Sequence, residues 1–271
     1  MAGLTRACHA GPTLTVTAVI TAFGIAVGRG TGALWVGAAV LAGQLSVGWS
    51  NDYLDRDRDR AAHRDDKPIP AGAVPARVVA AGAAAALAAA VPLSLASGWR
   101  AGLVHLGGVA AAWAYNLGLK GTWLSPLPYA IGFGALPAFV VLGLPGHPAP
   151  PGWLIAAGVL LGVGAHFANV LPDMDDDIAV GIVGVPHRLG RRRSTLTAGG
   201  LLFAASIVLA FGPRGDPGVT GLVEITGATC LIVVGGIAAR RPTSRIPFQI
   251  ALAVSILDVA LLLTNAHRVI P

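Results

Sequence analysis

Ten of the 13 acidic residues in this sequence of 271 residues lie in two short segments, residues 52–66 and residues 173–177. Carboxylates crowded together repel one another, and at the boundary of an apolar phase they also lose hydration. Divalent cations are the natural compensation. Mg²⁺ in particular prefers hard oxygen ligands and is usually held by one or two carboxylates together with the phosphate groups of a substrate. The two segments therefore indicate where phosphate chemistry would take place.

The first acidic segment has a helical spacing. Asn51, Asp55 and Asp59 stand at i, i+4 and i+8, and Asp52 stands one turn before Asp55. Positions at this spacing share one face of a helix. If the helix that is predicted to end at residue 52 continues through residues 51–59, it presents an acidic stripe.

The second segment, residues 169–177, repeats the pattern with Asn169, Asp173 and Asp177. Two such helical stripes facing each other would hold Mg²⁺ ions with a diphosphate between them. The predicted metal ligands are the Asn and Asp residues of the two stripes: Asn51, Asp52, Asp55, Asp59, Asn169, Asp173 and Asp177. The alternative for either segment alone is a solvated loop whose aspartates cap helices, and the matched pair disfavours it.

A calcium-binding loop is a further alternative for the first segment, because Asp55, Asp57 and Asp59 form a D-x-D-x-D start. The next position of such a loop should be glycine and is Arg60, and the twelfth should be glutamate and is Asp66. These departures exclude a calcium loop. The D-G-x-x-A-R start of a CDP-alcohol phosphotransferase is also absent.

Basic side chains surround both segments and suit contacts to phosphate. Lys120 is the strongest of them as a diphosphate ligand, because it is the only charged residue in its predicted loop. Arg64 and Lys67 come next, and Arg188 follows the second segment. We expect most of the other basic residues to act only as determinants of membrane topology.

The elements that must position these side chains are predicted to be membrane-spanning helices. The sequence is 54% hydrophobic and only 12% charged, with a mean hydropathy of +0.69, whereas a soluble domain carries about 25% charged residues. This composition excludes an ordinary cytosolic enzyme, a disordered chain and a nucleic-acid-binding domain, in spite of the net charge of +6. Cys8 and Cys230 form neither a disulfide framework nor a zinc motif.

Nine stretches approach the length of about 20 mainly apolar residues that a spanning helix needs. They are residues 13–28, 33–52, 75–96, 101–117, 126–143, 152–172, 194–212, 218–239 and 246–267. Threonines interrupt the first stretch and no clear cleavage site closes it, so we expect a helix and not a cleaved signal peptide. The sequence thus predicts an all-α integral membrane protein with one domain over residues 1–271.

The basic residues also predict an orientation. If nine helices span the membrane and the N-terminus is cytoplasmic, 15 of the 19 basic residues fall on the cytoplasmic side. This distribution satisfies the positive-inside rule. Both acidic segments then lie on that same side of the cell membrane, after the second and the sixth helix.

At these residues the sequence resembles the UbiA superfamily of intramembrane prenyltransferases. Residues 51–59, which read N-D-x-x-D-x-x-x-D, are similar to the first aspartate-rich motif of that family. Residues 173–177, which read D-x-x-x-D, are similar to the second. Residues 65–72, 115–120 and 181–190 resemble stretches that accompany the two motifs.

The resemblance implies about nine transmembrane helices around a central cavity, with a lipid-facing opening for a prenyl chain and Mg²⁺ between the motifs. It implies catalytic roles for residues of both motifs and one lysine: Asp52, Asp55, Asp173, Asp177 and Lys120. It implies diphosphate contacts from basic residues and a tyrosine: Lys120, Arg64, Lys67, Tyr115 and Arg188. The extra Asp175 and Asp176, and Val185 in place of the frequent Thr-Leu, depart from the family pattern and leave the substrate open.

The predicted function is Mg²⁺-dependent transfer of a prenyl group from an allylic diphosphate to a small acceptor, aromatic or a quinone precursor. Aromatic residues placed to stabilise an allylic cation are Trp49, Trp113, Tyr115, Tyr129, Phe133 and Phe167. The alternatives are a terpene cyclase on the same scaffold, transfer to a sugar phosphate and, from another class, a membrane transporter or Mg²⁺ channel.

Three histidines lie close to these segments. His166, one turn before Asn169, is open to three roles: orienting an acceptor, acting as a base, or simple packing. His63 and His187 are expected in loops, without a catalytic role.

Overall fold

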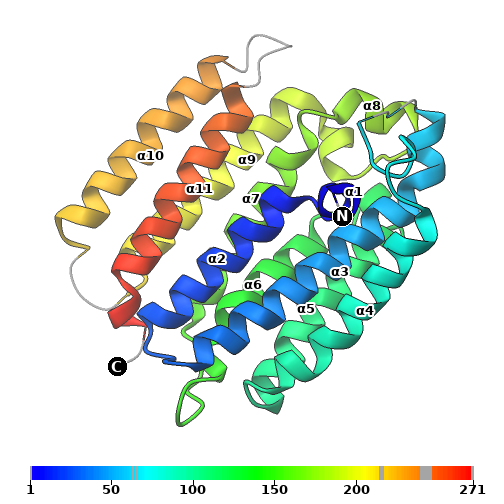
Figure 1. Ribbon diagram of the computed structural model, residues 1–271. Coiled ribbons are helices and arrows are strands. Elements are labelled where there is room, and N and C mark those ends of the chain that lie inside the picture. The colour runs from blue at the N-terminus through cyan, green and yellow to red at the C-terminus, as the bar shows by residue number, and fades with distance from the viewer. Residues whose placement is uncertain (1, 63, 65, 214–216, 239–245, 270–271) are drawn as a thin grey trace.

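The computed structural model describes residues 2–62, 64, 66–213, 217–238 and 246–269. Within these residues the fold is all-helical, as predicted (Figure 1). Nine long helices are described: α2 (Ala10–Ala26), α3 (Gly32–Ala61), α4 (Ala76–Leu95), α5 (Trp99–Leu117), α6 (Leu127–Leu142), α7 (Gly152–Val170), α9 (Val185–Phe211), α10 (Gly218–Ala238) and α11 (Ile246–Thr264). Four shorter elements complete the description: α1 (Ala2–Ala7), α8 (Met174–Ala179) and the 3₁₀ turns η1 (Leu119–Gly121) and η2 (Ala266–Arg268).

The nine long helices correspond one to one with the nine predicted stretches. Four of them are long and apolar enough to cross a bilayer by length and composition: α3, α4, α7 and α9. Alanine and leucine favour the helical state along these segments, and prolines stand where several helices begin. Pro75 and Pro151 precede α4 and α7, and Pro186 lies in the first turn of α9.

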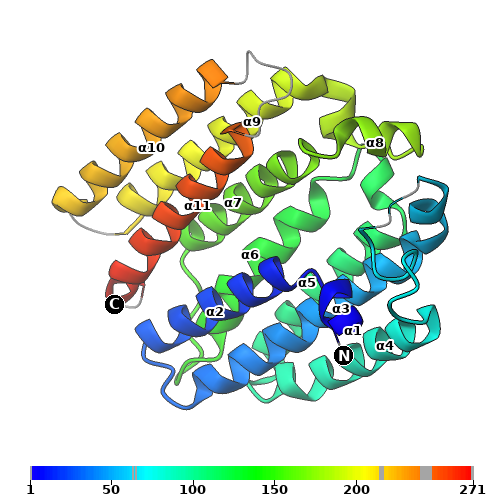
Figure 2. The ribbon, with the colours of Figure 1, turned by 45° about the horizontal axis from the view of Figure 1, so that its top comes forward.

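The helices pack in chain order around the bundle. Each long helix contacts the next, from α2 to α7 and on through α9 and α10 to α11, and α11 returns to α2. The two views of the ribbon show this arrangement, with α8 at the same end of the bundle as the C-terminal end of α3 (Figures 1 and 2). The largest group of buried apolar side chains, which includes Phe23 and Phe139, lies toward the other end.

Two boundaries differ from the prediction in ways that matter for the acidic segments. α3 continues to Ala61, nine residues past its predicted end at residue 52, so the whole first segment is helical. The prediction of one helical stripe is wrong for the second segment, because α7 ends at Val170 and Asp173 is the N-cap of α8. Pro172 stands at the break: Leu171 still has helical dihedral angles, but Pro172 has no backbone N–H to continue the hydrogen bonds of the helix.

The start of α9 also lies outside the prediction. The helix begins at Val185 and not near residue 194, and it is kinked at Gly190. His187, which was expected in a loop, is therefore a helical residue of its first turn.

Candidate active site

The last three turns of α3 carry the first acidic segment at one end of the bundle. Asp52 is only 2% exposed, whereas Asp57 is 69% exposed. The helical period separates an inward face from an outward one, so the predicted stripe, and not the segment as a whole, faces the protein. The inward carboxylates require partners, because an unpaired buried charge is costly.

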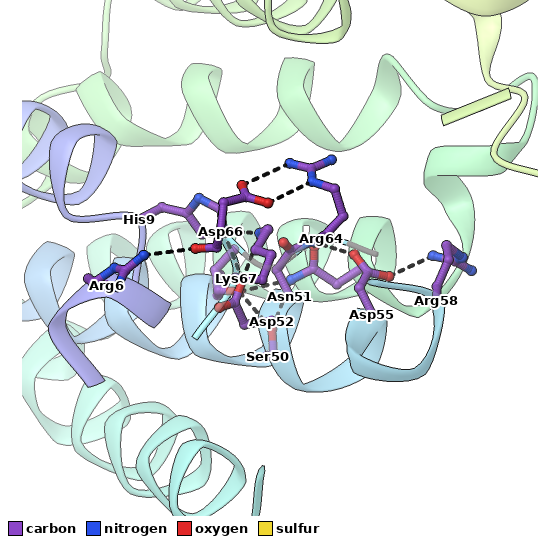
Figure 3. A network of polar contacts seen from close by, with 12 residues as sticks. Arg6, His9, Ser50, Asn51, Asp52, Asp55, Arg58, Arg64, Asp66 and Lys67 are labelled. Carbon is purple, nitrogen blue, oxygen red and sulfur yellow. Dashed lines mark hydrogen bonds and ion pairs between the residues drawn. The ribbon is translucent and has the colours of Figure 1, made fainter. Parts of the chain in front are cut away.

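Asp52 receives its partners from outside α3. Lys67 Nζ, from the loop after the helix, donates to Asp52 Oδ1 at 2.8 Å. His9 Nε2, from the turn between α1 and α2, lies 3.2 Å from the same oxygen. Asp52 Oδ2 is buried and has no hydrogen-bond partner. Figure 3 shows this network with the side chains that surround it.

Asp55 is paired from η1 and from its own helix. Lys120, itself buried, forms an ion pair with both carboxylate oxygens of Asp55. Arg58 Nη1 donates to Asp55 Oδ1 at 2.6 Å, and Asn51 Nδ2 donates to Asp55 Oδ2 at 3.1 Å. Lys120, which was singled out as the lone charge of its loop, is thus brought onto the first segment.

Asn116 fastens the end of α5 to α3 beside this pair. Its Nδ2 donates to Val47 O at 2.9 Å and to Ser50 Oγ at 2.8 Å, and its Oδ1 accepts from Asn51 at 3.3 Å. No local pattern marks Asn116 by itself, because its partners are far from it along the chain. These bonds fix the position of the η1 turn relative to Asp55.

The second segment is more open. Asp173 and Asn169 are exposed, and Asp177 is 27% exposed. Asp177 Oδ2 lies 3.2 Å from His187 Nε2, and His187 Nδ1 accepts the backbone N–H of Gly184 at 3.1 Å. Since Nδ1 is an acceptor, the proton of the neutral ring is on Nε2, which donates to Asp177. His187 thereby anchors Asp177, the last residue of the second segment.

Arg64 and Tyr115 connect the two segments. Arg64 interacts electrostatically with Asp59 of the first segment and Asp173 of the second. It also pairs with Asp66 at 3.1 Å, and hydrogen bonding from this guanidinium lowers the pKa of the Asp66 carboxyl. The Tyr115 hydroxyl interacts electrostatically with both Asp55 and Asp177. Both segments therefore lie within electrostatic range of the same two side chains.

An aromatic cluster lies next to this junction. The rings of Tyr115 and Tyr129 meet edge to face at 5.3 Å, and His166 lies 4.8 Å from Tyr129. His166 Nε2 is 3.1 Å from the hydroxyl of Ser125, which also accepts the backbone N–H of Val185 at 3.0 Å. Ser125 fixes the imidazole against the start of α9.

Lys120 and Ser125 pack closely on the loop before α9. A Cβ added to Gly184 would lie 2.5 Å from the backbone oxygen of Lys120 and 2.7 Å from Ser125 Oγ. Glycine alone permits this approach. Lys120 and the His187 turn therefore share one packed contact.

A cavity of about 300 Å³ opens beside Asp55. Its polar lining comes from α3, α5 and η1, and the backbone of the loop before α9 closes it: Asp55, Arg58, Asn116, Lys120, Gly181 and Ile182. The cavity is large enough for a phosphate-bearing group, with two cations in its wall.

The donor atoms fit Mg²⁺. No group of three or more His, Cys, Asp or Glu side chains in the described part of the chain is already gathered as a metal site. However, Asp52 Oδ2 and Asp59 Oδ2 are buried without a hydrogen-bond partner, and carboxylate oxygens are the ligands that Mg²⁺ prefers. Lys67 partly neutralises both carboxylates. An arriving cation would take its place, and the lysine would then be free to bind an anionic substrate.

The remaining predicted residues lie farther out. Arg188 is exposed and stacks on Trp123, with its guanidinium carbon 4.6 Å from the ring centre. Asp175 is exposed and pairs with Arg191 at 3.1 Å. Asp258, in α11, is buried and accepts a hydrogen bond from Ser206 at 2.6 Å, which is a helix-packing contact. His63 and Asp65 lie outside the described residues.

Comparisons with known proteins agree with this geometry. A model of the UbiA prenyltransferase family matches residues 11–253. The 33 kDa chain of bacteriochlorophyll synthase from Cereibacter sphaeroides is 36% identical over 165 residues, which are 56% of this chain and 53% of that protein. The digeranylgeranylglyceryl phosphate synthase of Natronomonas pharaonis is 32% identical over 173 residues, 62% of this chain and 61% of the relative. The aligned part thus spans between half and two thirds of these relatives.

Solved structures share the fold. A UbiA homolog from Archaeoglobus fulgidus bound to GPP and Mg²⁺ superposes with a TM-score of 0.74 at 17% identity, covering 99% of both chains. A UbiA homolog from Aeropyrum pernix in its apo form gives 0.73 at 22% identity, covering 93% of this chain and 97% of the other. The chain is a multi-pass integral membrane protein, and with the family model matched over most of its length, it belongs to the UbiA prenyltransferase family.

Proposed function

We propose that this protein is a Mg²⁺-dependent prenyltransferase that ionises an allylic prenyl diphosphate and transfers the prenyl group to a small acceptor. The observation that carries the proposal is the junction of the two acidic segments: buried Asp52 and Asp55 on α3, with Arg64 and Tyr115 coupled to both segments. The relative bound to GPP and Mg²⁺ supports the same pairing of ligands for this chain.

The diphosphate would bind through an exchange of partners. Lys67 and Lys120 neutralise Asp52 and Asp55 in the structure described here. When Mg²⁺ is bound by the carboxylates, it supplies compensation for the charge on the phosphate oxygens. The two ammonium groups are then available to the diphosphate, and Arg64 completes a cationic wall between the segments. The predicted metal ligands and diphosphate contacts, Arg188 and Asn169 included, are part of this proposal.

The reaction would proceed by loss of the diphosphate. The allylic C–O bond breaks and its electron pair leaves with the diphosphate, whose developing charge the fixed cations stabilise. The faces of Tyr115 and Tyr129 offer the allylic cation about 0.5–2 kcal/mol of stabilisation. The apolar helices around the cluster exclude water, which delays quenching until the acceptor forms the new bond and loses a proton.

We also propose that the N-terminus and the site face the cytoplasm. The proposal depends on the distribution of basic residues, 15 of 19 of which fall on that side of a nine-span topology. The acceptor is proposed as a class only, a small aromatic or quinone-precursor molecule.

The test is incubation of the purified protein with Mg²⁺ and prenyl diphosphates of several lengths, with and without aromatic acceptors. We expect release of diphosphate and a prenylated acceptor, both lost when a chelator removes Mg²⁺. A cyclic hydrocarbon formed without acceptor would assign the protein as a terpene cyclase instead. Absence of diphosphate release with every chain length would overturn the enzyme proposal and favour a transporter.

A further inference from the structure

The N-terminal segment, residues 2–9, reaches the first acidic segment although it precedes the residues that match the family model. Ala7 of α1 is buried with Ile69 and Val74 of the loop that follows α3. Trp49 Nε1, on α3, donates to Leu4 O at 2.9 Å. The short helix therefore packs both on α3 and on the loop that carries Lys67.

The end of this segment lies directly against the backbone of α3. A Cβ added to Gly48 would lie 2.5 Å from the carbonyl oxygen of Cys8, so a side chain at this position would prevent the approach. The same carbonyl accepts a hydrogen bond from Thr13 Oγ1 at 2.8 Å. Cys8 thus contacts α3 one helical turn before Asp52, and the next residue, His9, comes within reach of the Asp52 carboxylate.

His9 adopts a backbone conformation that few residues other than glycine accept. Its φ of 53° and ψ of 60° lie in the left-handed region, which costs free energy for a residue with a Cβ. Strained residues of this kind cluster at functional sites, where the surrounding structure holds them. Here the turn directs the imidazole toward the carboxylate of Asp52 (Figure 3).

The contacts around Asp52 Oδ1 indicate how His9 orients this carboxylate. Oδ1 of Asp52 lies 3.2 Å from His9 Nε2 and 2.8 Å from Lys67 Nζ, and the two nitrogens are 3.3 Å apart. With the proton on Nε2, both nitrogens donate to Oδ1; without it, a lone pair of Nε2 would face the carboxylate. Two donors thereby anchor one oxygen, and the buried Oδ2 keeps its lone pairs unused.

We infer that His9 is a positioning residue for the metal site: it anchors Asp52 Oδ1, beside Lys67 as long as no diphosphate is bound, and thereby presents Oδ2 to a divalent cation. The inference rests on the proposed function, in which Asp52 binds Mg²⁺. A residue that orients a metal ligand changes metal affinity by about 10–100-fold when it is removed.

The test measures Mn²⁺ binding by electron paramagnetic resonance to the full chain in lipid nanodiscs, without prenyl diphosphate and therefore without turnover. His9→Gly removes the imidazole and accepts the left-handed backbone, so it should fold and bind Mn²⁺ about tenfold more weakly. His9→Gln keeps an N–H donor at similar reach and should recover most of the affinity. Arg6→Gln is the matched control, because it removes a bond from α1 to the carbonyl of Asp66 without touching Asp52.

Three outcomes would overturn the inference: unchanged Mn²⁺ affinity in His9→Gly, no recovery in His9→Gln, or an equal loss in Arg6→Gln, which would mean that α1 acts by packing alone. Failure of the proposed function is distinguishable from these, because then the wild-type protein itself would bind no Mn²⁺ and release no diphosphate.

Discussion

The first acidic segment ends one unbroken helix, whereas the second is divided between the end of α7 and the short helix α8. On α3, Asp52 and Asp55 are buried or nearly so and receive cations from distant parts of the chain. In the second segment, Asp173 is exposed, and His187 is placed against Asp177. The two segments look alike in sequence but not in how their charge is compensated.

The carboxylates of the first segment are compensated within the folded protein, whereas those of the second are open to solvent and, in our proposal, to the ligand. We call these the organised half and the open half of the proposed site. Buried carboxylates need partners in the folded state itself, so Lys67 and Lys120 belong to the fold as well as to the proposed chemistry. Exposed carboxylates are stabilised by water and need no protein partner before a cation binds. Substitutions in both segments and at their partners test this difference.

Asp52→Ala and Asp173→Ala should each lower the rate of diphosphate release by about 10³-fold, the scale on which loss of one electrostatic group acts in an active site. Turnover is measured with a prenyl diphosphate and Mg²⁺, and membrane insertion by fractionation. If Asp173 were dispensable while Asp52 was not, only the organised half would bind metal. Full activity in both variants would contradict the metal assignment.

Lys120→Met should lower the thermal stability of the protein by an amount that depends on Mg²⁺. Breaking a buried pair typically costs about 3–5 kcal/mol when the remaining charge has no other partner. The loss here should be smaller, because Arg58 and Asn51 still contact Asp55. We expect a lower thermal midpoint without metal, and partial recovery of that midpoint when Mg²⁺ is added. The same midpoint with and without Mg²⁺ would show that no cation takes the place of the lysine at Asp55. Arg192→Met, a change at an exposed residue outside the proposed site, is the control.

His187→Ala should raise the Mg²⁺ concentration for half-maximal activity by about tenfold, since His187 holds one oxygen of Asp177. The thermal midpoint should fall less than in Lys120→Met, because Asp177 stays partly hydrated. An Mg²⁺ dependence equal to that of the wild type would remove His187 from the site.

Asp175→Asn should have no measurable effect. Its carboxylate is 85% exposed, and its pair with Arg191 is a surface contact. Both the rate and the thermal midpoint are expected to stay within error of the wild type. A large loss of rate would mean that the extra aspartates of the second segment bind metal, and the open half would then be richer in ligands than its geometry indicates.

Much of the fold could be predicted because it depends on local patterns. Apolar length located all nine long helices, and the continuation of α3 to Ala61 meets the condition under which Asn51, Asp55 and Asp59 share one face. The break between α7 and α8 lies at Pro172, a local signal that the matched spacing of Asn169, Asp173 and Asp177 does not include.

The partners of each carboxylate could not be predicted in the same way. Lys67, Lys120 and Arg64 were recognised as relevant cations, yet nothing in the spacing tells that Lys120 pairs with Asp55 and Lys67 with Asp52. His9 and Asn116 carry no motif, and their contacts join residues more than 40 positions apart. Long-range pairing is decided by the packing of the bundle, which periodicity does not encode.

The close approach at Gly184 has a consequence for how this site could vary among descendants of the protein. Any larger residue there would push on the backbone of Lys120, and so disturb the first segment from the loop between the second segment and α9. A library of all substitutions at residue 184, selected for function, should retain glycine almost alone, although the residue offers no reactive group. The two halves of the site are thus bound to evolve together at this point.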